Sequence, residues 1–209
     1  MRQTMTKTRN ATEEIRRLYD VKEILLGAGM FGKVYLAHSK DSSNIKYAVK
    51  VLQKKRIEMT QMNMLREELE TLCELDHPYI TTYVESFEDQ KYLYIVMEYC
   101  QGKEMFLYLE EKEHFSERDA ANTMYKVLEG LNHIHSIGVV HRDLKPENIM
   151  MDEKGEPRII DFGLSKNTRG NTKVLKSIVG SKLYMAPEIL TGDQHGVEAD
   201  MWSIGIIIF

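Results

Sequence analysis

The chain of 209 residues has little cysteine, little proline and no long apolar run. Its two cysteines, Cys73 and Cys100, are not at metal-ligand spacing and support no disulfide framework. No apolar stretch approaches the roughly 20 residues of a membrane-spanning helix. The residues at 1–18 are polar and basic, so they show no signal peptide, and Arg2 stands where myristoylation requires glycine. We therefore expect a cytoplasmic protein with reduced thiols and no membrane association.

An excess of positive charge is also lacking. The chain carries 28 Lys and Arg against 32 Asp and Glu, for a formal net charge of −4. Nucleic acids and anionic membranes attract basic surfaces, so neither is expected as a partner. The composition that is present, 43% hydrophobic and 29% charged residues, is sufficient for a folded core with a solvated surface.

The stretch at 139–163, VVHRDLKPENIMMDEKGEPRIIDFG, contains three oxygen-bearing side chains at fixed offsets: Asp143, Asn148 and Asp161. Short apolar runs at 149–151 and 158–160 flank the turn signal Asp-Glu-Lys-Gly, which predicts a β-hairpin. Such a hairpin brings Asn148 and Asp161 to the same end of the strand pair. Carboxylate and amide oxygens, together with substrate phosphates, are the ligands that Mg²⁺ prefers. This end of the hairpin is therefore a candidate magnesium site.

A second pattern, GxGxxG, is formed by Gly27, Gly29 and Gly32. By itself it is also typical of dinucleotide-binding domains, in which a helix follows the third glycine. Here residues 33–37, KVYLA, alternate and are rich in strand formers. The glycines are therefore expected to join two antiparallel strands, with backbone N–H groups able to approach phosphates because no Cβ blocks them.

A lysine and a glutamate form a third candidate feature. A strand predicted at 45–52 places Lys50 on the same face as Ala48 and Leu52 by its two-residue period. The segment at 58–75 has apolar residues at helical spacing, and Glu68 lies inside that apolar stripe. A carboxylate on a buried face requires a cation, and Lys50 is the expected partner.

Further elements are predicted from strand alternation and from capping signals. Strands are expected at 81–87 and 91–99, joined by Glu-Asp-Gln. Ser116 with Asp119 three residues later predicts the start of a long buried helix. In the same way, Asn10 with Glu13 predicts a short helix ending at Leu18.

The motifs HRDLKPEN at 141–148, DFG at 161–163 and APE at 186–188 resemble, in type and order, the signature set of protein kinases. The lysine two residues after Asp143, Lys145, resembles the pattern of serine/threonine kinases rather than that of tyrosine kinases. The segments LDHPYI, FEDQKYLYIVMEYC and DFGLSK resemble the calcium/calmodulin-dependent group, especially calcium-dependent protein kinases. The resemblance covers residues 19–209.

The resemblance implies an α+β, two-lobed protein-kinase fold, with a small antiparallel-sheet lobe carrying one helix and a mainly helical second lobe. We expect residues 1–18 to be an N-terminal extension, 19–98 the small lobe and 99–209 part of the large lobe. The apolar segment at 200–209 resembles the central helix of the large lobe, and the chain ends within it. We therefore expect a truncated chain with exposed apolar surface on this helix.

The same resemblance implies transfer of a phosphoryl group from ATP, with Mg²⁺, to serine or threonine residues of protein substrates. Asp143 is implied to accept the substrate proton and Lys145 to neutralise charge on the γ-phosphate, while Glu68 holds Lys50 against the other phosphates. The implied ATP-binding residues are Gly27, Ala28, Gly29, Met30, Phe31, Gly32, Lys33, Val34, Ala48, Lys50, Met97, Glu98, Cys100, Glu104 and Met150.

The remaining site residues also follow from the resemblance. Asn148 and Asp161 are the implied metal ligands, and Ser177 is a possible phosphorylation site. Glu104 and Glu147 match acidic positions that favour an arginine three residues before the phosphoacceptor. The alternatives to an active kinase are a pseudokinase or scaffold, or a truncated fragment without function. No EF-hand loop occurs in these residues, so any calcium-sensing regulatory segment is expected outside this chain.

Overall fold

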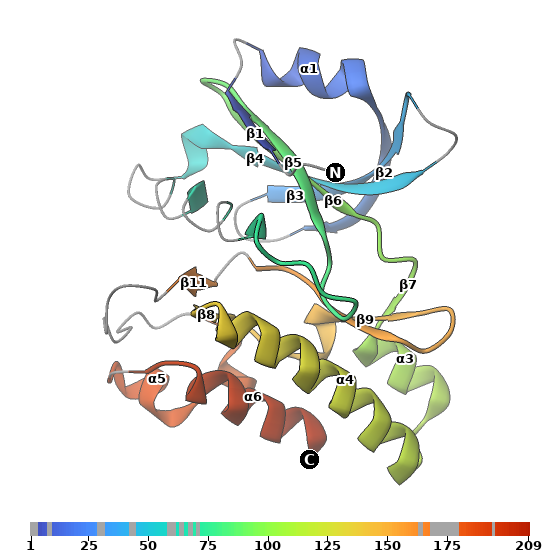
Figure 1. Cartoon of the computed structure of the whole chain (residues 1–209), viewed down its shortest axis with the longest axis vertical. Helices are drawn as coiled ribbons and strands as arrows, with labels where there is room; N and C mark the ends of the chain where they lie inside the picture. The colour runs from blue at the N-terminus through green and yellow to red at the C-terminus, as the bar shows by residue number, and fades with distance from the viewer. Residues whose placement is uncertain are drawn as a thin grey trace. The chain divides into compact units, whose positions relative to one another are not determined.

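The computed structural model describes residues 4–7, 10–28, 32–41, 45–57, 62, 65–66, 69, 72–162, 165–167, 180–193 and 195–209. The chain divides into two compact units, which are described separately below and whose elements are labelled in Figure 1. Unit 1 comprises Met1–Glu74 and Thr81–Cys100, and unit 2 comprises Leu75–Ile80 and Gln101–Phe209.

Unit 1 is built on a six-stranded sheet with the order β1-β5-β6-β4-β3-β2. Neighbouring strands from β2 to β6 pair antiparallel, so the predicted small antiparallel sheet and the glycine hairpin between β2 and β3 are confirmed. The strands are β1 (Thr4–Lys7), β2 (Tyr19–Ala28), β3 (Gly32–Ser39), β4 (Lys46–Gln53), β5 (Tyr83–Glu88) and β6 (Tyr92–Glu98).

One strand of this sheet was not expected from the sequence. β1 pairs parallel with β5, with Thr4 opposite Glu85 and Lys7 opposite Glu88. A sheet edge carries unpaired N–H and C=O groups, and pairing with β1 satisfies those of β5. The short polar segment before the family motifs therefore extends the sheet beyond the five antiparallel strands.

The predicted N-terminal helix, α1 (Ala11–Leu18), is confirmed, and it packs on one face of the sheet (Figure 1). Asn10 caps it by accepting a hydrogen bond from the Glu13 N–H at 3.1 Å. Ala11 and Ile15 are 0% and 1% exposed and join a core cluster with Val49 and residues of the neighbouring strands. The residues expected to be an extension thus supply one side of the core of unit 1.

The other face of the sheet is covered by the segment that follows β4. The 3₁₀ turn η1 (Lys54–Arg56) leads into residues of which 62, 65, 66, 69 and 72 are helical. Leu65 and Leu69 are buried against Leu52 and Ile95 of the sheet, as the apolar spacing predicted. The helical residues end at 72, three positions before the predicted end at Leu75, and a turn follows.

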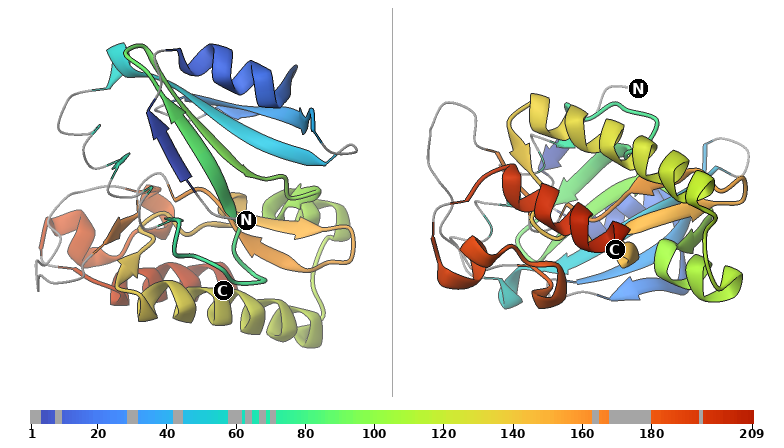
Figure 2. Two further views of the ribbon diagram at one scale, coloured as in Figure 1. Left: turned by 45° about the horizontal axis from the view of Figure 1, so that its top comes forward. Right: turned by 90° about the horizontal axis from the view of Figure 1, so that it is seen from below.

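Unit 2 contains four helices among its described residues, together with two small sheets (Figure 2). The predicted hairpin at 149–160 is confirmed by the antiparallel pair β9 and β10, and β7 joins it on the other side of β9. The elements are β7 (Gly102–Glu104), α3 (Met105–Lys112), α4 (Glu117–Ser136), β8 (Val139–Val140), η2 (Pro146–Asn148), β9 (Ile149–Asp152), β10 (Pro157–Ile159), β11 (Lys166–Asn167), η3 (Lys182–Tyr184), α5 (Pro187–Thr191) and α6 (Glu198–Ile208).

The two longest of the described helices, α4 and α6, run side by side in the views of Figures 1 and 2. Ser116 caps α4 by accepting the Asp119 N–H at 3.1 Å, as predicted. On α6, Ala199 and Ile204 are buried, whereas Trp202 and other large apolar side chains of this helix are exposed. Among the described helices, none combines the length and the apolarity that crossing a membrane requires.

Candidate active site

In unit 1 the sheet brings four of the implied ATP-site residues to one face. Val34 on β3 and Lys50 on β4 are Cα partners, and so are Ala48 on β4 and Met97 on β6. Directly opposed residues of an antiparallel pair point to the same face, and residues two apart on a strand share a face. These four positions therefore place Lys50 among three apolar side chains.

The glycine hairpin adjoins this row of residues. Gly27 is the Cα partner of Val34, and Ala28 is the partner of Lys33. A Cβ at Gly32 would collide with the backbone of Val51, which explains why this position excludes a side chain. Gly29, Met30, Phe31, Glu68 and Ser177 lie outside the described residues.

Glu98 and Cys100 close the list of implied ATP-site residues in unit 1. The backbone N–H of Glu98 donates to the Thr82 carbonyl at 2.9 Å, so this donor is already committed within the unit. The thiol of Cys100 lies 3.6 Å from the Thr81 hydroxyl. Cys73 and Cys100 are both in the thiol form.

In unit 2 a buried carboxylate on α6 anchors the HRD loop, which begins at His141. Asp200 is 0% exposed, and its two oxygens accept the backbone N–H groups of His141 and Arg142, each at 2.8 Å. His135 on α4 also lies 2.8 Å from this carboxylate. Arg142 has a φ of 68°, a left-handed conformation that is costly for a residue with a side chain. The two hydrogen bonds offset that cost and fix the course of the loop.

His141 is a buried packing residue of this loop. Its side chain is 0% exposed, and its ring lies 5.0 Å from the Phe162 ring. Nε2 is 3.1 Å from the Ile160 carbonyl, and Nδ1 accepts the Asp143 N–H at 3.3 Å. This imidazole therefore joins the HRD loop to the segment that precedes DFG.

The carboxylate of Asp143 is the centre of a polar cluster. Its Oδ2 lies 3.0 Å from Lys145 Nζ and accepts the side-chain amide of Asn148, also at 3.0 Å. Its Oδ1 accepts both the backbone N–H and the hydroxyl of Ser181, each at 2.8 Å. Lys145 also donates to the Ser181 hydroxyl at 2.8 Å. The structure thus brings Asp143, Lys145 and Asn148 together, as the motif spacing implied.

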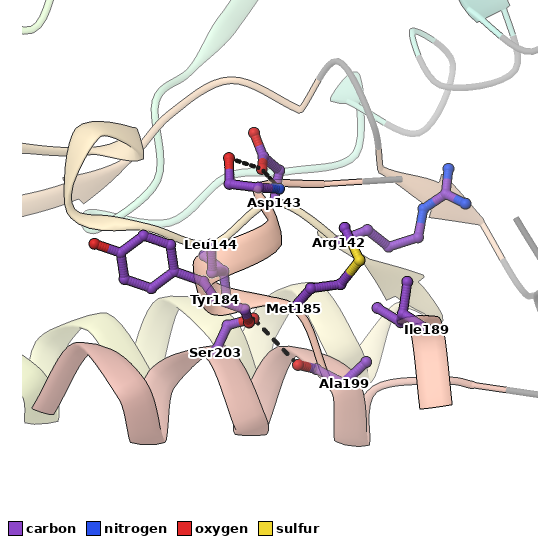
Figure 3. A pocket seen from close by; sticks show the side chains of 9 residues that line it. Arg142, Asp143, Leu144, Tyr184, Met185, Ile189, Ala199 and Ser203 are labelled. Atoms are coloured by element: carbon purple, nitrogen blue, oxygen red, sulfur yellow. Dashed lines mark hydrogen bonds between the residues drawn. The ribbon is translucent and has the colours of Figure 1, made fainter. Parts of the chain in front are cut away.

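A small pocket lies beside this cluster (Figure 3). Gly180 precedes Ser181 with a φ of 114°, and a Cβ there would collide with the Arg142 carbonyl. Ser203 on α6 donates to the Tyr184 carbonyl at 2.7 Å, which anchors the segment after Ser181 to α6. The residues that line the pocket are Arg142, Asp143, Leu144, Ser181, Tyr184, Met185, Ile189, Ala199 and Ser203.

The hairpin of β9 and β10 brings the two implied metal ligands to one end, as predicted from the turn signal. The Ile160 N–H donates to the Asn148 carbonyl at 2.9 Å, so Asp161, the next residue, follows directly beside Asn148. On the other side of β9, Glu104 of β7 is the Cα partner of Met150. This pairing brings together two further implied ATP-site residues.

Two residues of this site were not assigned from the sequence. Asp200 begins an otherwise apolar segment, and one acid among apolar residues is a signal for a buried, partnered carboxylate. The contacts of Ser181 with Asp143 and Lys145 join residues that are 38 and 36 positions apart, respectively. No periodicity or local motif predicts contacts at that separation.

Comparison with known proteins agrees with this geometry. The family model described as "Protein kinase domain" matches residues 19–209. Myosin light chain kinase A of Dictyostelium discoideum is 39% identical over 94% of the chain and 66% of its own length. Calcium/calmodulin-dependent protein kinase type 1 of Caenorhabditis briggsae is 39% identical over 95% of the chain and 55% of its own length. For ribosomal protein S6 kinase alpha-1 of Homo sapiens the identity is 35%, over 88% and 25%.

The chain therefore spans between about a quarter and two thirds of the length of these curated relatives. The matches confirm the predicted resemblance to serine/threonine kinases, including the calcium/calmodulin-dependent group. They also confirm the α+β fold with a small sheet lobe and a helical part. Residues 19–209 form a protein kinase domain, and the chain belongs to the protein kinase family.

Proposed function

We propose that the whole protein transfers the γ-phosphoryl group of ATP to serine and threonine hydroxyls of protein substrates. The observation that carries this proposal is the cluster around Asp143. A carboxylate with a lysine at 3.0 Å and a serine hydroxyl at 2.8 Å, on a loop fixed by Asp200, is a preorganised proton acceptor. Catalysis of phosphoryl transfer depends mainly on such positioning and on charge stabilisation.

In this proposal Asp143 orients the substrate hydroxyl and accepts its proton, and Lys145 stabilises charge on the γ-phosphate. Lys50, held by Glu68, pairs with the α- and β-phosphates, and the backbone of residues 27–32 covers them. The remaining ATP-binding residues are those implied by the resemblance, with residues 19–98 and 99–209 as the two lobes and 1–18 as the segment before them. The common sheet face of Val34, Ala48, Lys50 and Met97 supports this assignment.

A divalent cation, Mg²⁺, fits the residues at the end of the hairpin. Asn148 directs its amide nitrogen to Asp143, with contacts of 2.7 and 3.0 Å, so its carbonyl oxygen is the atom offered to a hard cation. We propose this oxygen and the carboxylate of Asp161 as the ligands. When bound, the cation neutralises the phosphate charge that develops during transfer.

A preference for basic substrates is the second part of the proposal. Glu147 lies in η2, which packs against α3, and Glu104 immediately precedes α3. Within the described part of the chain, Glu147 Oε2 is buried without a hydrogen-bond partner. A buried carboxylate oxygen of this kind is stabilised by a guanidinium group, which supports recognition of arginine before the phosphoacceptor. Selection of acidic or proline-directed sequences from a peptide library would contradict it.

Regulation and location complete the proposal. Phosphorylation at Ser177, paired with Arg142, is proposed to order the activation segment. One relative is named as calcium/calmodulin-dependent, and we propose that any such control resides outside these 209 residues. We propose a cytoplasmic location, protein substrates, and neither nucleic acid nor membrane as partner.

The experiment that tests the function is phosphoryl transfer from labelled ATP to an arginine-containing serine peptide by the full-length protein. Lys50→Met and Asp143→Asn are each expected to lower kcat by at least about 10²-fold, since each removes a charge used in the transition state. Lys46→Met, on the same strand as Lys50 but exposed, is the matched control and retains activity. Binding of ATP and Mg²⁺ without any transfer by the wild-type protein would instead favour a pseudokinase.

A further inference from the structure

A buried carboxylate in unit 1, Glu88 at the end of β5, has no role in the proposed function. Its side chain is 4% exposed. Lys54 Nζ lies 2.7 Å from its Oε1, and Arg66 Nε donates to its Oε2 at 3.1 Å, with a second Arg66 nitrogen on Oε1. One buried acid thus binds two cations that are themselves partly buried, at 21% and 30% exposure.

The charge state of Glu88 follows from these contacts. Burial by itself raises the pKa of this carboxyl, but the hydrogen bonds from Arg66 and Lys54 outweigh it, so the pKa is lowered from its ordinary value of 4.5. Glu88 is therefore ionised at neutral pH. Removing either cation leaves a buried negative charge with less compensation.

The two cations belong to different elements. Lys54 begins η1, four residues after Lys50 on β4. Arg66 is one of the helical residues that cover the sheet, and it directly follows the buried Leu65. Glu88 therefore joins three parts of unit 1: the end of β5, the end of β4 and the helical segment.

The turn that presents Glu88 is itself rigidly held. The next residue, Asp89, accepts the backbone N–H groups of Lys91 and Tyr92, each at 2.7 Å. It also accepts the Ala11 N–H at the start of α1 at 2.6 Å, and its carbonyl accepts Lys54 Nζ at 2.6 Å. The position of Glu88 is thus fixed by contacts that do not involve Arg66. The ion pair between Glu88 and Arg66 therefore restrains the helical segment that carries Arg66.

We propose that Glu88 is a positioning residue for phosphoryl transfer, which through Arg66 sets the segment carrying Glu68 against the strand carrying Lys50. The inference rests on the proposed function, in which Glu68 holds Lys50. Glu68 lies outside the described residues and follows Arg66 by two positions in the sequence. Lys54 directly follows the strand that carries Lys50, so its ion pair with Glu88 fixes the position of that strand relative to Glu88.

A test has to separate positioning from simple stabilisation, because both lower the measured activity. Stabilisation affects the fraction of folded protein, which is counted by the stoichiometry with which a fluorescent ATP analogue binds with Mg²⁺. Positioning affects the turnover of the molecules that bind. The two readouts together, kcat and binding stoichiometry, therefore distinguish the roles.

The variants are made in the full-length protein. Arg66→Met is expected to lower kcat by about 10- to 100-fold at unchanged binding stoichiometry, and Arg66→Lys to restore most of it, since it keeps one charged donor. Arg17→Met is the matched control, because Arg17 also pairs with a glutamate in unit 1, at 2.9 Å, but on the exposed side of α1. Glu88→Gln combined with Arg66→Met is expected to cost little more than Glu88→Gln alone, because Glu88→Gln already removes the ion pair with Arg66.

Wild-type kcat in Arg66→Met would overturn the inference, and so would a loss matched by an equal loss of binding stoichiometry. If the wild-type protein transfers no phosphate while Arg66→Met is folded, the proposed function fails instead. Hydrogen exchange over residues 62–72 then decides on the contact itself: faster exchange in Arg66→Met than in Arg17→Met supports it, and equal exchange overturns it.

Discussion

The buried carboxylate of Asp200 on α6 accepts the backbone N–H of Arg142 at 2.8 Å, although 58 positions separate the two residues. The contact holds Arg142 in a left-handed conformation with a φ of 68°. It links α6 to the loop that carries Asp143. The course of the loop that carries Asp143 thus depends on a residue that has no contact with the reacting groups in the proposed mechanism.

Replacing Asp200 with alanine is expected to destabilise the protein. The change leaves the buried N–H groups of His141 and Arg142 without an acceptor, at a cost of about 2–5 kcal/mol in the free energy of unfolding. Asp200→Asn retains one acceptor oxygen and is expected to lose less. Urea denaturation of the full-length protein measures both, and equal stability of Asp200→Ala and wild type would contradict the anchoring role.

Ser181 is expected to affect turnover rather than stability. Its hydroxyl contacts both Asp143 and Lys145 at 2.8 Å, so Ser181→Ala loosens the two groups assigned to proton and charge handling. We expect kcat to fall by roughly 10- to 100-fold. Ser181→Thr keeps the hydroxyl and should remain close to wild type. Similar kcat values for the alanine and threonine variants would show that these contacts do not matter for transfer.

The packing of α1 predicts that this helix contributes to stability. Ile15 is 1% exposed in the core cluster of unit 1, so Ile15→Ala is expected to cost about 2–5 kcal/mol. Ile24 on β2 is 54% exposed, and Ile24→Ala provides a matched change outside the core, with an expected effect within about 0.5 kcal/mol. Thermal unfolding of the two variants compares them directly, and equal melting temperatures would argue against a stabilising role of α1.

The pH dependence of stability is expected to reflect Glu88. Its pKa is lowered on folding, so its ion pairs contribute stability above the ordinary value of 4.5, and this contribution is lost as the pH falls through the folded-state value. The stability difference between wild type and Glu88→Gln should therefore be largest near neutral pH and shrink in acid. Urea titrations at several pH values measure it, and a difference independent of pH would contradict an ionised Glu88.

Much of the site was predictable from local sequence. The hairpin that brings Asn148 and Asp161 together depends on a turn signal between two short apolar runs, and both are contiguous in the chain. The caps at Asn10 and Ser116 involve residues three positions apart, so they are visible as a pattern. The glycine hairpin was separated from a dinucleotide fingerprint by the alternation that follows it.

Other features were not predictable because they join residues distant in sequence. The parallel pairing of β1 with β5 depends on an edge that exists only after the sheet has formed. The contacts of Ser181 with Asp143 and of Arg66 with Glu88 join polar side chains that have no periodic relation. A polar residue reveals its partner only when burial has brought the two together.

The sequence by itself determined the resemblance to the kinase family, the antiparallel strands of unit 1, the helices α1 and α4, the hairpin of β9 and β10, and the residue types that carry the chemistry. These depend on motif order, on periods of 2 and 3.6 residues, and on caps, all of which are local. Only the tertiary structure decided that α1 belongs to the core, that Asp200 holds the HRD loop and that Glu88 binds two cations. The reason is physical: the free energy of a buried charge or an unpaired N–H depends on its surroundings in space, which the order of residues does not state.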